Sequence, residues 1–357
     1  MPVCESSGLF CRQHGQYDEP SQRGTSGMTA FLTLVLIVVS ATWGAMALWF
    51  KSPAAGRARW ALPALWAALS ATMLVGFLGG HLWCLWLYAG MLGLLLLWWF
   101  CLVRPQNDRA WMPEVSRQTY GSAVDGMVRL HNVRDFRWVS SEEFDPRWVS
   151  RDYDLSRLAS VDLILSYWGR PAVAHAMVSF GFEGGEYALF SVEIRRKRGD
   201  KFSEIGGFFR QYELAVLAST EEDSLKVRTN VRGEDGYLYR VVMDQAAASA
   251  LFLAYVDTAN SLIKKPRFYN TITANCTTLV YQLADRIVPG LPLDYRVLLS
   301  GYLPEYLFAL GALAGANSPT EYRSKGRYTD RARESQDEGS FSHDIRRGVP
   351  GVVGKAS

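Results

Sequence analysis

A single cysteine lies in the last two thirds of the 357-residue chain, within the stretch TANCTTLV at residues 273–280. The residues before Cys276 have the composition of a loop, whereas those after it are typical of a helix. Thr273 or Asn275 can cap that helix, so Cys276 falls in its first turn. Unpaired N–H groups and the helix dipole stabilise an anion there, which lowers a thiol pKa, and the same groups could hold an oxyanion. Cys276 is therefore a candidate nucleophile.

A cysteine nucleophile also needs a base, and the soluble part of the chain holds few histidines. His131 follows a predicted strand, and His343 lies in a polar C-terminal stretch. His175 lies in the middle of the apolar stretch AVAHAMVSFGF, where an imidazole without a partner is costly. We therefore predict that His175 is the base for Cys276.

A hairpin is predicted around the sequence EGGE, because two glycines between apolar, β-branched runs are typical of a tight turn. Its returning strand carries Glu193 at about the level of His175. A carboxylate there would orient the imidazole, as the third member of a catalytic triad does. A slip of one residue in the register would turn Glu193 to the other face, and then Asn275, Tyr269 or a backbone carbonyl would orient the ring.

The elements that must position these residues are mostly strands, followed by helices. Periodicity predicts further strands at residues 128–133, 136–139, 160–168, 212–219, 224–230 and 236–243, and helices at 244–263 and 276–287. Strands followed by helices indicate an α+β fold around an antiparallel sheet.

Two apolar runs precede this domain. Residues 29–50 carry no charge and are long enough to cross about 30 Å of hydrocarbon. Residues 60–103 are also uncharged but too long for one span, so we expect a break near Gly79-Gly80-His81. Met28 directly precedes the first run and is an alternative start. The predicted organisation is a polar leader at 1–28, a transmembrane anchor at 29–50, 60–79 and 81–103, a soluble catalytic domain at 104–347 and a flexible tail at 348–357.

Two sequence signals disagree about the side of the membrane on which the C-terminal domain lies. Lys51, Arg57 and Arg59 lie in the first loop, and the positive-inside rule places that loop in the cytoplasm. Three spans would then put the C-terminal domain there too. The stretch ATWGAMA at residues 41–47 is similar to a signal-peptidase site, and cleavage there would leave two spans and an outward domain.

Composition excludes several classes of protein. The 38 Lys and Arg residues nearly balance the 35 Asp and Glu residues, so the net charge of +3 does not favour a nucleic-acid partner. The five cysteines show no CxxC spacing, and two of them lie in apolar runs. We therefore expect no disulfide framework, no metal and no organic cofactor.

Five segments resemble the Lnb-type family, named for its N-terminal periplasmic domain: WGRPAVAHAMVSFGF, FSVEIRRKRGDKFSEIGGFFRQYEL, KVRTN, FYNTITANCTT and FSHDIRRG. The resemblance extends over residues 111–348 and to the anchor before them. It implies a domain outside the cytoplasm on a bacterial inner membrane, against the positive-inside rule, and we follow the resemblance. It also implies movement of an acyl chain within a lipoprotein, from the diacylglyceryl group to the α-amino group of the N-terminal cysteine.

The resemblance implies site residues as well. The family's His and Cys match His175 and Cys276, the Glu of its SxExR segment matches Glu193 beside Arg195, and its Tyr-Glu pair matches Tyr212 and Glu213. A histidine on a strand followed by NC at a helix start is also similar to a circularly permuted branch of papain- and NlpC-like thiol enzymes, which includes lecithin-retinol acyltransferases.

The expected function is a membrane-anchored, cysteine-dependent acyltransferase that acts through a thioester on lipoprotein or phospholipid acyl esters beside membrane lipids. Supporting or substrate-binding residues are expected to be Asn275, Thr277, Tyr212, Tyr269, Arg195 and Arg228. The two arginines would meet lipid phosphates or form salt bridges. One alternative is a thiol hydrolase of the cell envelope, an amidase or peptidase. Another is a non-catalytic, membrane-anchored binding module in which Cys276 and His175 are structural and Glu193 belongs to a solvated strand end.

Overall fold

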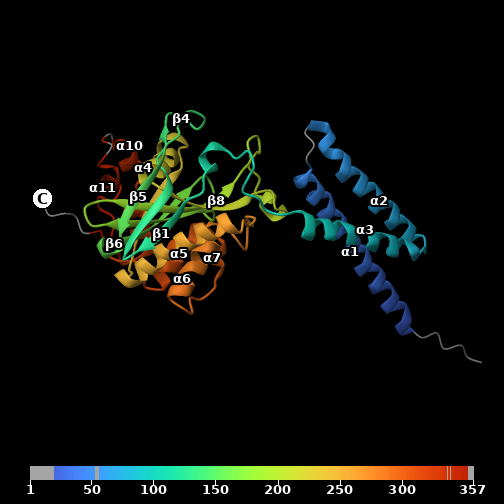
Figure 1. Ribbon diagram of the computed structural model, residues 1–357. Coiled ribbons are helices and arrows are strands. Elements are labelled where there is room, and N and C mark those ends of the chain that lie inside the picture. The colour runs from blue at the N-terminus through green and yellow to red at the C-terminus, as the bar shows by residue number, and fades with distance from the viewer. Residues whose placement is uncertain (1–19, 53–55, 336, 338, 353–357) are drawn as a thin grey trace, which may run out of the picture. The chain divides into compact units, whose positions relative to one another are not determined.

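The computed structural model describes residues 20–52, 56–335, 337 and 339–352. The chain divides into two compact units, Met1–Val103 and Arg104–Ser357 (Figure 1). The first unit contains long helices and the second contains the sheet, so the expected α+β domain behind an apolar helical anchor is confirmed.

The first unit is built from three apolar helices, α1 (Pro20–Lys51), α2 (Ala61–Leu78) and α3 (Trp83–Leu97). By length and composition each could cross a membrane, over Gly27–Lys51, Gly56–Leu78 and Trp83–Leu102. Gly80 between α2 and α3 has a φ of +88°, which glycine adopts without strain, so the break falls in the Gly-Gly-His segment. Helix α1 begins at Pro20, inside the expected leader, while residues 1–19 lie outside the described residues.

Side chains from all three helices pack together within this unit. Trp66 of α2 donates its ring N–H to the carbonyl of Ala41 over 2.9 Å. Ser40 of α1 and Tyr88 of α3 share a hydrogen bond of 2.8 Å between their hydroxyl oxygens. Such polar contacts join helices whose remaining surface is apolar, as is common in membrane-spanning bundles.

The second unit is built on a mixed sheet with the order β1-β2-β9-β8-β7-β6-β10, and β5 pairs with β2 beside this path. The strands are β1 (Tyr120–Val124), β2 (Met127–Arg134), β5 (Trp148–Asp154), β6 (Leu158–Tyr167), β7 (Ala174–Phe182), β8 (Tyr187–Arg195), β9 (Glu213–Ser219) and β10 (Asp235–Val241). A separate small hairpin joins β3 (Arg137–Trp138) and β4 (Phe144–Asp145). The pairing of β2 with β9 is parallel, so the sheet is not purely antiparallel as expected.

The hairpin predicted around EGGE is confirmed as β7 and β8. Gly184 and Gly185 in its turn have φ values of +97° and +88°, a region that disfavours residues with a Cβ atom. Met177 pairs with Ser191 in the register that this turn sets. Because successive side chains alternate between the two faces, this register decides which side chains of β7 and β8 can meet.

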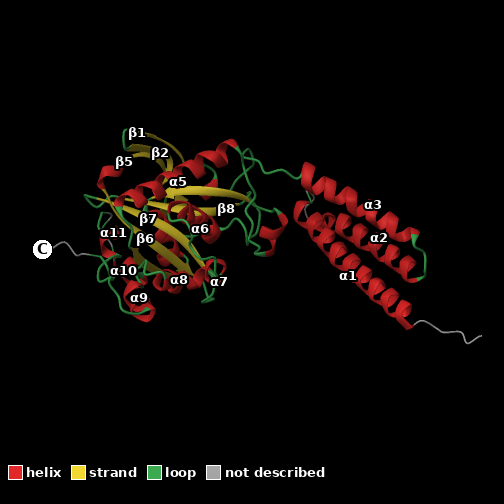
Figure 2. Cartoon of the chain, turned by 90° about the horizontal axis from the view of Figure 1, so that it is seen from below, coloured by secondary structure: helices red, strands yellow, loops and turns green. Residues whose placement is uncertain are grey.

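One face of the sheet is covered by α5 (Gln245–Lys264) and α6 (Cys276–Ile287), as Figure 2 shows for α5. Phe180 and Phe190 of the sheet contact Phe252 of α5 with ring centroids 5.1 and 5.3 Å apart. Helix α5 is apolar and long enough to span a membrane, but its buried stripe belongs to this core. Both helices agree with the predicted ranges.

Alternate residues such as Met177 and Leu189 point to the other face, where they pack with Tyr328, Phe341 and Ile345. The helices of this side are α4 (Glu221–Lys226), α10 (Thr329–Glu334) and α11 (Phe341–Asp344). Three more helices pack against the ends of β6, β7 and β10. They are α7 (Tyr295–Leu298), α8 (Leu303–Ala309) and α9 (Pro319–Gly326).

Two expectations are wrong in this unit. The strand expected at residues 224–230 is absent, because Thr220 caps this segment as helix α4, which continues into a π-helical turn at Val227–Val231. The flexible tail does not begin at residue 348, since Val349 is buried against Phe341 and Ile345. Residues 353–357 of that tail lie outside the described residues.

Candidate active site

Cys276 is the first residue of α6, and Asn275 is its cap. Oδ1 of Asn275 accepts hydrogen bonds from the N–H groups of Thr277 and Thr278 over 2.9 and 2.8 Å. The hydroxyl of Thr278 accepts in return from the N–H of Asn275 over 3.0 Å, which completes a capping box. We expected the free N–H groups at the helix start to hold an oxyanion. The side chain of Asn275 binds two of them, those of Thr277 and Thr278, so the N–H of Cys276 is the remaining candidate.

His175 and Glu193 meet across the hairpin. His175 Nε2 lies 3.1 Å from Glu193 Oε1 and 2.7 Å from Ser191 Oγ. Ser191 also donates to Glu193 Oε1 over 2.6 Å. The register that pairs Met177 with Ser191 would place Glu193 opposite His175 if it continued by two residues. Among the candidate partners of the ring, the structure therefore selects the carboxylate.

Strands β7 and β8 separate where the site forms. Their pairing stops at Met177 and Ser191, although β7 remains paired with β6 as far as Ala174 and β8 with β9 as far as Arg195. The start of α6 packs against both strands at this opening. The His175 ring and the backbone N–H of Ala176 both lower the pKa of the Cys276 thiol, so both lie beside it. Since Nε2 of His175 faces Glu193, we infer that Nδ1 faces the thiol.

The electrostatics of the three side chains favour a charged pair. Burial by itself raises the pKa of the Cys276 thiol, but the hydrogen bond and charge of His175 outweigh it, so this pKa is lowered. Burial and the charge of Arg228 lower the pKa of His175, yet the charge of Glu193 and the hydrogen bond to Cys276 raise it overall. Burial raises the pKa of Glu193, but His175 and Arg228 hold it well below its ordinary value. A thiolate beside an imidazolium is the form that these shifts favour.

A buried polar network behind the site was missed by sequence reasoning. Arg228 donates to Glu193 over 3.4 Å and to Glu234 over 3.2 Å. Ser166, which pairs with His175 in the sheet, donates to Glu234 over 2.5 Å. The network keeps Glu193 ionised inside the domain. No local sequence signal identifies Glu234 or Ser166, because their roles depend on strand pairing.

Of the residues expected to support the site, Thr277 and Tyr269 lie near Cys276, whereas Tyr212 makes its contacts elsewhere. Thr277 Oγ1 is 4.0 Å from Cys276 Sγ. Tyr269 packs against the same apolar cluster as Cys276; burial, with the negative charges of Cys276 and Glu193, raises its pKa. Tyr212 is bound elsewhere, since its hydroxyl accepts from the N–H of Ser203 over 2.7 Å.

The two arginines make internal contacts rather than the phosphate contacts that were one of their two expected roles. Arg228 belongs to the buried network of Glu193 and Glu234. Arg195 donates to the carbonyls of Val115 and Ser116 over 2.9 and 2.7 Å, and its guanidinium lies over the Trp111 ring at 4.4 Å. Arg195 thus holds the entry segment of the domain against β8.

A comparison with protein families matches the central part of the chain. Residues 144–301 match the model of the Lnb N-terminal periplasmic domain. This part of the chain belongs to that family. The match contains His175, Glu193 and Cys276, but it is shorter than the resemblance traced over residues 111–348. No curated protein and no solved structure matches the chain. The chain therefore carries an Lnb periplasmic domain together with helices suited to a membrane anchor.

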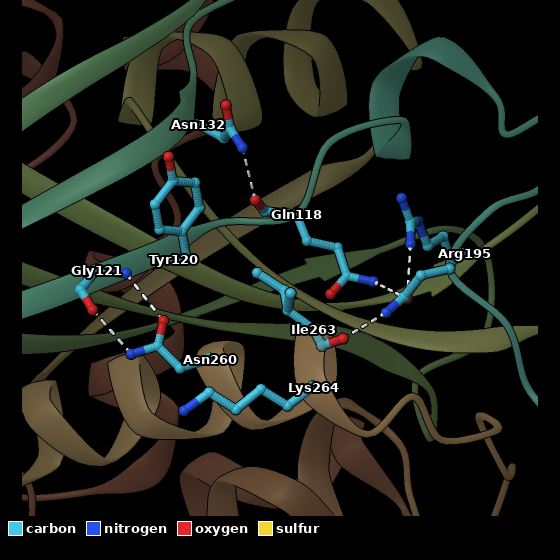
Figure 3. A pocket seen from close by; sticks show the side chains of 9 residues that line it. Gln118, Tyr120, Gly121, Asn132, Arg195, Asn260, Ile263 and Lys264 are labelled. Atoms are coloured by element: carbon cyan, nitrogen blue, oxygen red, sulfur yellow. Dashed lines mark hydrogen bonds between the residues drawn. The ribbon is translucent and has the colours of Figure 1, made fainter.

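A cavity of the second unit lies away from these residues. Its volume is about 590 Å³, and its lining consists of Asn107, Gln118, Tyr120, Gly121, Asn132, Arg195, Asn260, Ile263 and Lys264. Figure 3 shows the cavity from close by. Its amide side chains bind one another or the backbone, as when Gln118 Nε2 donates to Asn107 Oδ1 over 2.8 Å. It contains none of the three central residues, so we do not assign the reaction to it.

Thiol labelling should reveal the low pKa of Cys276. A thiolate with a lowered pKa is present above that pKa and is lost as pH falls through it, so alkylation by iodoacetamide should remain fast at pH values below those needed by a thiol of ordinary pKa, 9.0. His175→Ala removes the hydrogen bond and the charge but keeps most of the burial, so the rate curve should move to higher pH. Each unit of that shift slows labelling at neutral pH about tenfold.

The measurement is the alkylated fraction of the Cys276 peptide, by mass spectrometry, against time and pH. His131→Ala is the matched control, because His131 stacks on Tyr120 at 4.7 Å and does not contact the thiol. Identical curves for wild type and His175→Ala would contradict the thiolate–imidazolium pair.

Proposed function

We propose that the Lnb domain is a cysteine-dependent acyltransferase that moves an acyl chain from a lipid ester to an amine through a thioester on Cys276. The arrangement of Cys276, His175 and Glu193 at a helix start carries this proposal, because it supplies a nucleophile, a proton carrier and an orienting carboxylate. The lipoprotein N-terminus is the substrate that the family favours. The periplasmic side of the membrane is the orientation that fits that substrate.

The first half of the reaction forms the thioester. The Cys276 thiolate attacks the ester carbonyl, and the C–S bond forms as the negative charge moves to the carbonyl oxygen. The N–H groups of Ala176 and Cys276 are the nearest candidates to stabilise that oxygen. The carbon–oxygen bond to the leaving group then breaks, and the His175 imidazolium gives its proton to the departing alkoxide.

The second half transfers the chain. An amine attacks the thioester, and neutral His175 accepts the proton that the amine releases. A C–N bond forms and the C–S bond breaks, which returns the Cys276 thiolate and the His175 imidazolium. Glu193 stays ionised throughout and stabilises the charged ring.

The surroundings of the thiol suit an acyl chain. Cys276 packs against two apolar clusters, one containing Phe190 and Tyr255 and the other containing Ala176 and Val297. Apolar walls favour a lipid chain over a polar peptide and exclude water, which supports transfer to an amine over hydrolysis.

The decisive experiment is the mass of lipoprotein N-terminal peptides from cells that lack the protein and from cells that carry wild type or Cys276→Ala. We expect wild type to convert the diacylglyceryl form into an N-acyl lyso form and the variant to leave it unchanged. Unchanged lipoproteins in both strains would overturn the transfer proposal and favour the thiol hydrolase. Conversion by Cys276→Ala would exclude the thioester.

Glu193→Gln should slow the reaction while leaving the domain folded. Glutamine retains the shape but removes the charge, so the pKa of His175 falls, and each unit of that fall lowers the imidazolium population at neutral pH about tenfold. We expect kcat to drop by at least that factor with little change in KM. Glu183→Gln in the exposed hairpin turn is the matched control. Equal kcat values for the two variants would show that Glu193 does not orient the ring.

A further inference from the structure

An exposed apolar patch lies outside the three central residues. It consists of four side chains whose exposed fractions are 54, 51, 44 and 50%: Phe202, Ile205, Phe208 and Ile272. The first three follow one another at intervals of three residues, and residues 205–209 form a 3₁₀ helix. Residues three apart share one side of such a helix, so Ile205 and Phe208 face solvent on the same side.

The patch is tied to the loop that carries the nucleophile. Thr271 Oγ1, next to Ile272, donates to the carbonyl of Glu204 over 3.1 Å. Asn275, the cap of the Cys276 helix, donates from Nδ2 to the carbonyl of Thr271 over 2.6 Å. The loop that ends at Asn275 therefore connects the patch to Cys276 through these two hydrogen bonds.

Basic residues precede the patch residues along the chain in both segments. Exposed Arg198 and Lys201 precede Phe202, and three exposed basic residues precede the second segment: Lys264, Lys265 and Arg267. The acidic residues within 198–208 are Asp200 and Glu204, and none lies within 263–273. Exposed apolar side chains with basic residues close by in sequence suit the headgroup region of an anionic bilayer, where the apolar side chains insert and the charges meet phosphates.

The stretch that precedes the patch is hydrogen bonded to residues near the start of the second unit. The chain passes from Leu102 into residues 103–112, and the end of that segment pairs with the end of β8. Met112 donates its N–H to the carbonyl of Arg196 over 2.9 Å, and Arg198 donates to the carbonyl of Ala110 over 2.7 Å. Arg198 in turn leads into residues 202–208. Residues 110–112 and the stretch that leads into the patch are thus hydrogen-bonded neighbours within the second unit.

We propose that Phe202, Ile205, Phe208 and Ile272 form a membrane-docking surface that inserts into an anionic phospholipid bilayer and presents the Cys276 loop to it. The purpose of docking rests on the proposed acyl transfer, since the acyl donor lies in the bilayer. The docking itself involves no reaction and is measured separately.

The test of docking uses the full chain in lipid nanodiscs that contain anionic phospholipid. All five cysteines are replaced by serine, and one spin label is attached through Ile205→Cys. Val139→Cys is the matched control, because Val139 is an apolar residue with an exposed fraction of 74% beside the β3–β4 turn. We expect oxygen, which concentrates in lipid, to relax the Ile205 label more than a water-soluble nickel complex does, and the reverse for Val139. Equal, water-like behaviour of the two labels overturns the proposal.

A second measurement links docking to catalysis. Phe202→Ser with Ile205→Ser should raise KM about tenfold for an acyl donor in anionic vesicles and leave the rate on a soluble short-chain ester unchanged. A uniform loss on both donors would show a damaged site and overturn the role of the patch in donor capture. If wild type acylates Cys276 with neither donor, the proposed function fails, while the spin labels still decide whether the patch docks.

Discussion

Replacing Cys276 by alanine should abolish formation of the acyl-enzyme. The thiolate is the atom that bonds to the acyl carbon, and no neighbouring side chain in the described site offers a second nucleophile of similar reactivity. Loss of a catalytic nucleophile commonly costs on the order of 10⁴-fold or more in rate. His175→Ala should give a loss of similar order, because nucleophile and base act as one unit.

The measurement is the intact mass of the purified full chain after brief incubation with a long-chain p-nitrophenyl ester and an acid quench. Wild type should gain the mass of one acyl group and lose it again in neutral hydroxylamine, as a thioester does. Cys101→Ala is the matched control, since Cys101 is exposed in the first unit and far along the chain from the site. Persistent hydroxylamine-sensitive acylation in Cys276→Ala would refute the mechanism.

Arg346→Leu should strongly destabilise the second unit, Arg104–Ser357. Arg346 is buried over Tyr187 and donates to Glu221 over 2.6 and 2.7 Å and to Asp162 over 2.9 Å. Asp162 keeps a second partner in Arg240, but Glu221 would lose its cation while buried. Removing one member of a buried pair costs about 3–5 kcal/mol.

In a domain of this size, that loss corresponds to a fall in Tm of roughly 10 °C. The check is thermal unfolding together with hydrogen–deuterium exchange of the β6 and β7 peptides, which should lose protection. Arg347→Leu is the matched control, because the neighbouring side chain is 56% exposed. The double variant Arg346→Leu, Glu221→Gln should recover much of the loss, since no charge is then left unpaired. Similar Tm values for the two single variants would show that the buried pair contributes little.

Arg346 also explains why the last part of the chain is ordered. By composition alone, the FSHDIRRG segment is typical of a polar surface followed by a tail. In the structure Arg346 of this segment binds Asp162 of β6 and Glu221 of α4. Val349 packs in the apolar cluster with Phe341 and Ile345. Sequence alone could not predict this order, because the partners Asp162 and Glu221 lie far away along the chain.

Several features of this protein follow from local sequence. The cap residue Asn275 and the helix from Cys276 to Ile287 were predictable, because capping depends on residues three or four positions apart. The β7–β8 hairpin was predictable because two glycines fix the turn and the turn fixes the register. The three apolar helices follow from uncharged runs of sufficient length.

Only the tertiary structure decided what these elements do together. Local sequence left the partner of His175 open among Glu193, Asn275, Tyr269 and a carbonyl, and the strand register selected Glu193. The separation of β7 from β8, which admits the start of α6, has no sequence signal, because it depends on packing between distant segments. The same holds for Arg228, which stabilises the site through Glu193 and Glu234 rather than contacting a phosphate. Candidate residues could be found from their types and spacing, but their charge states depend on burial and on partners brought together by folding.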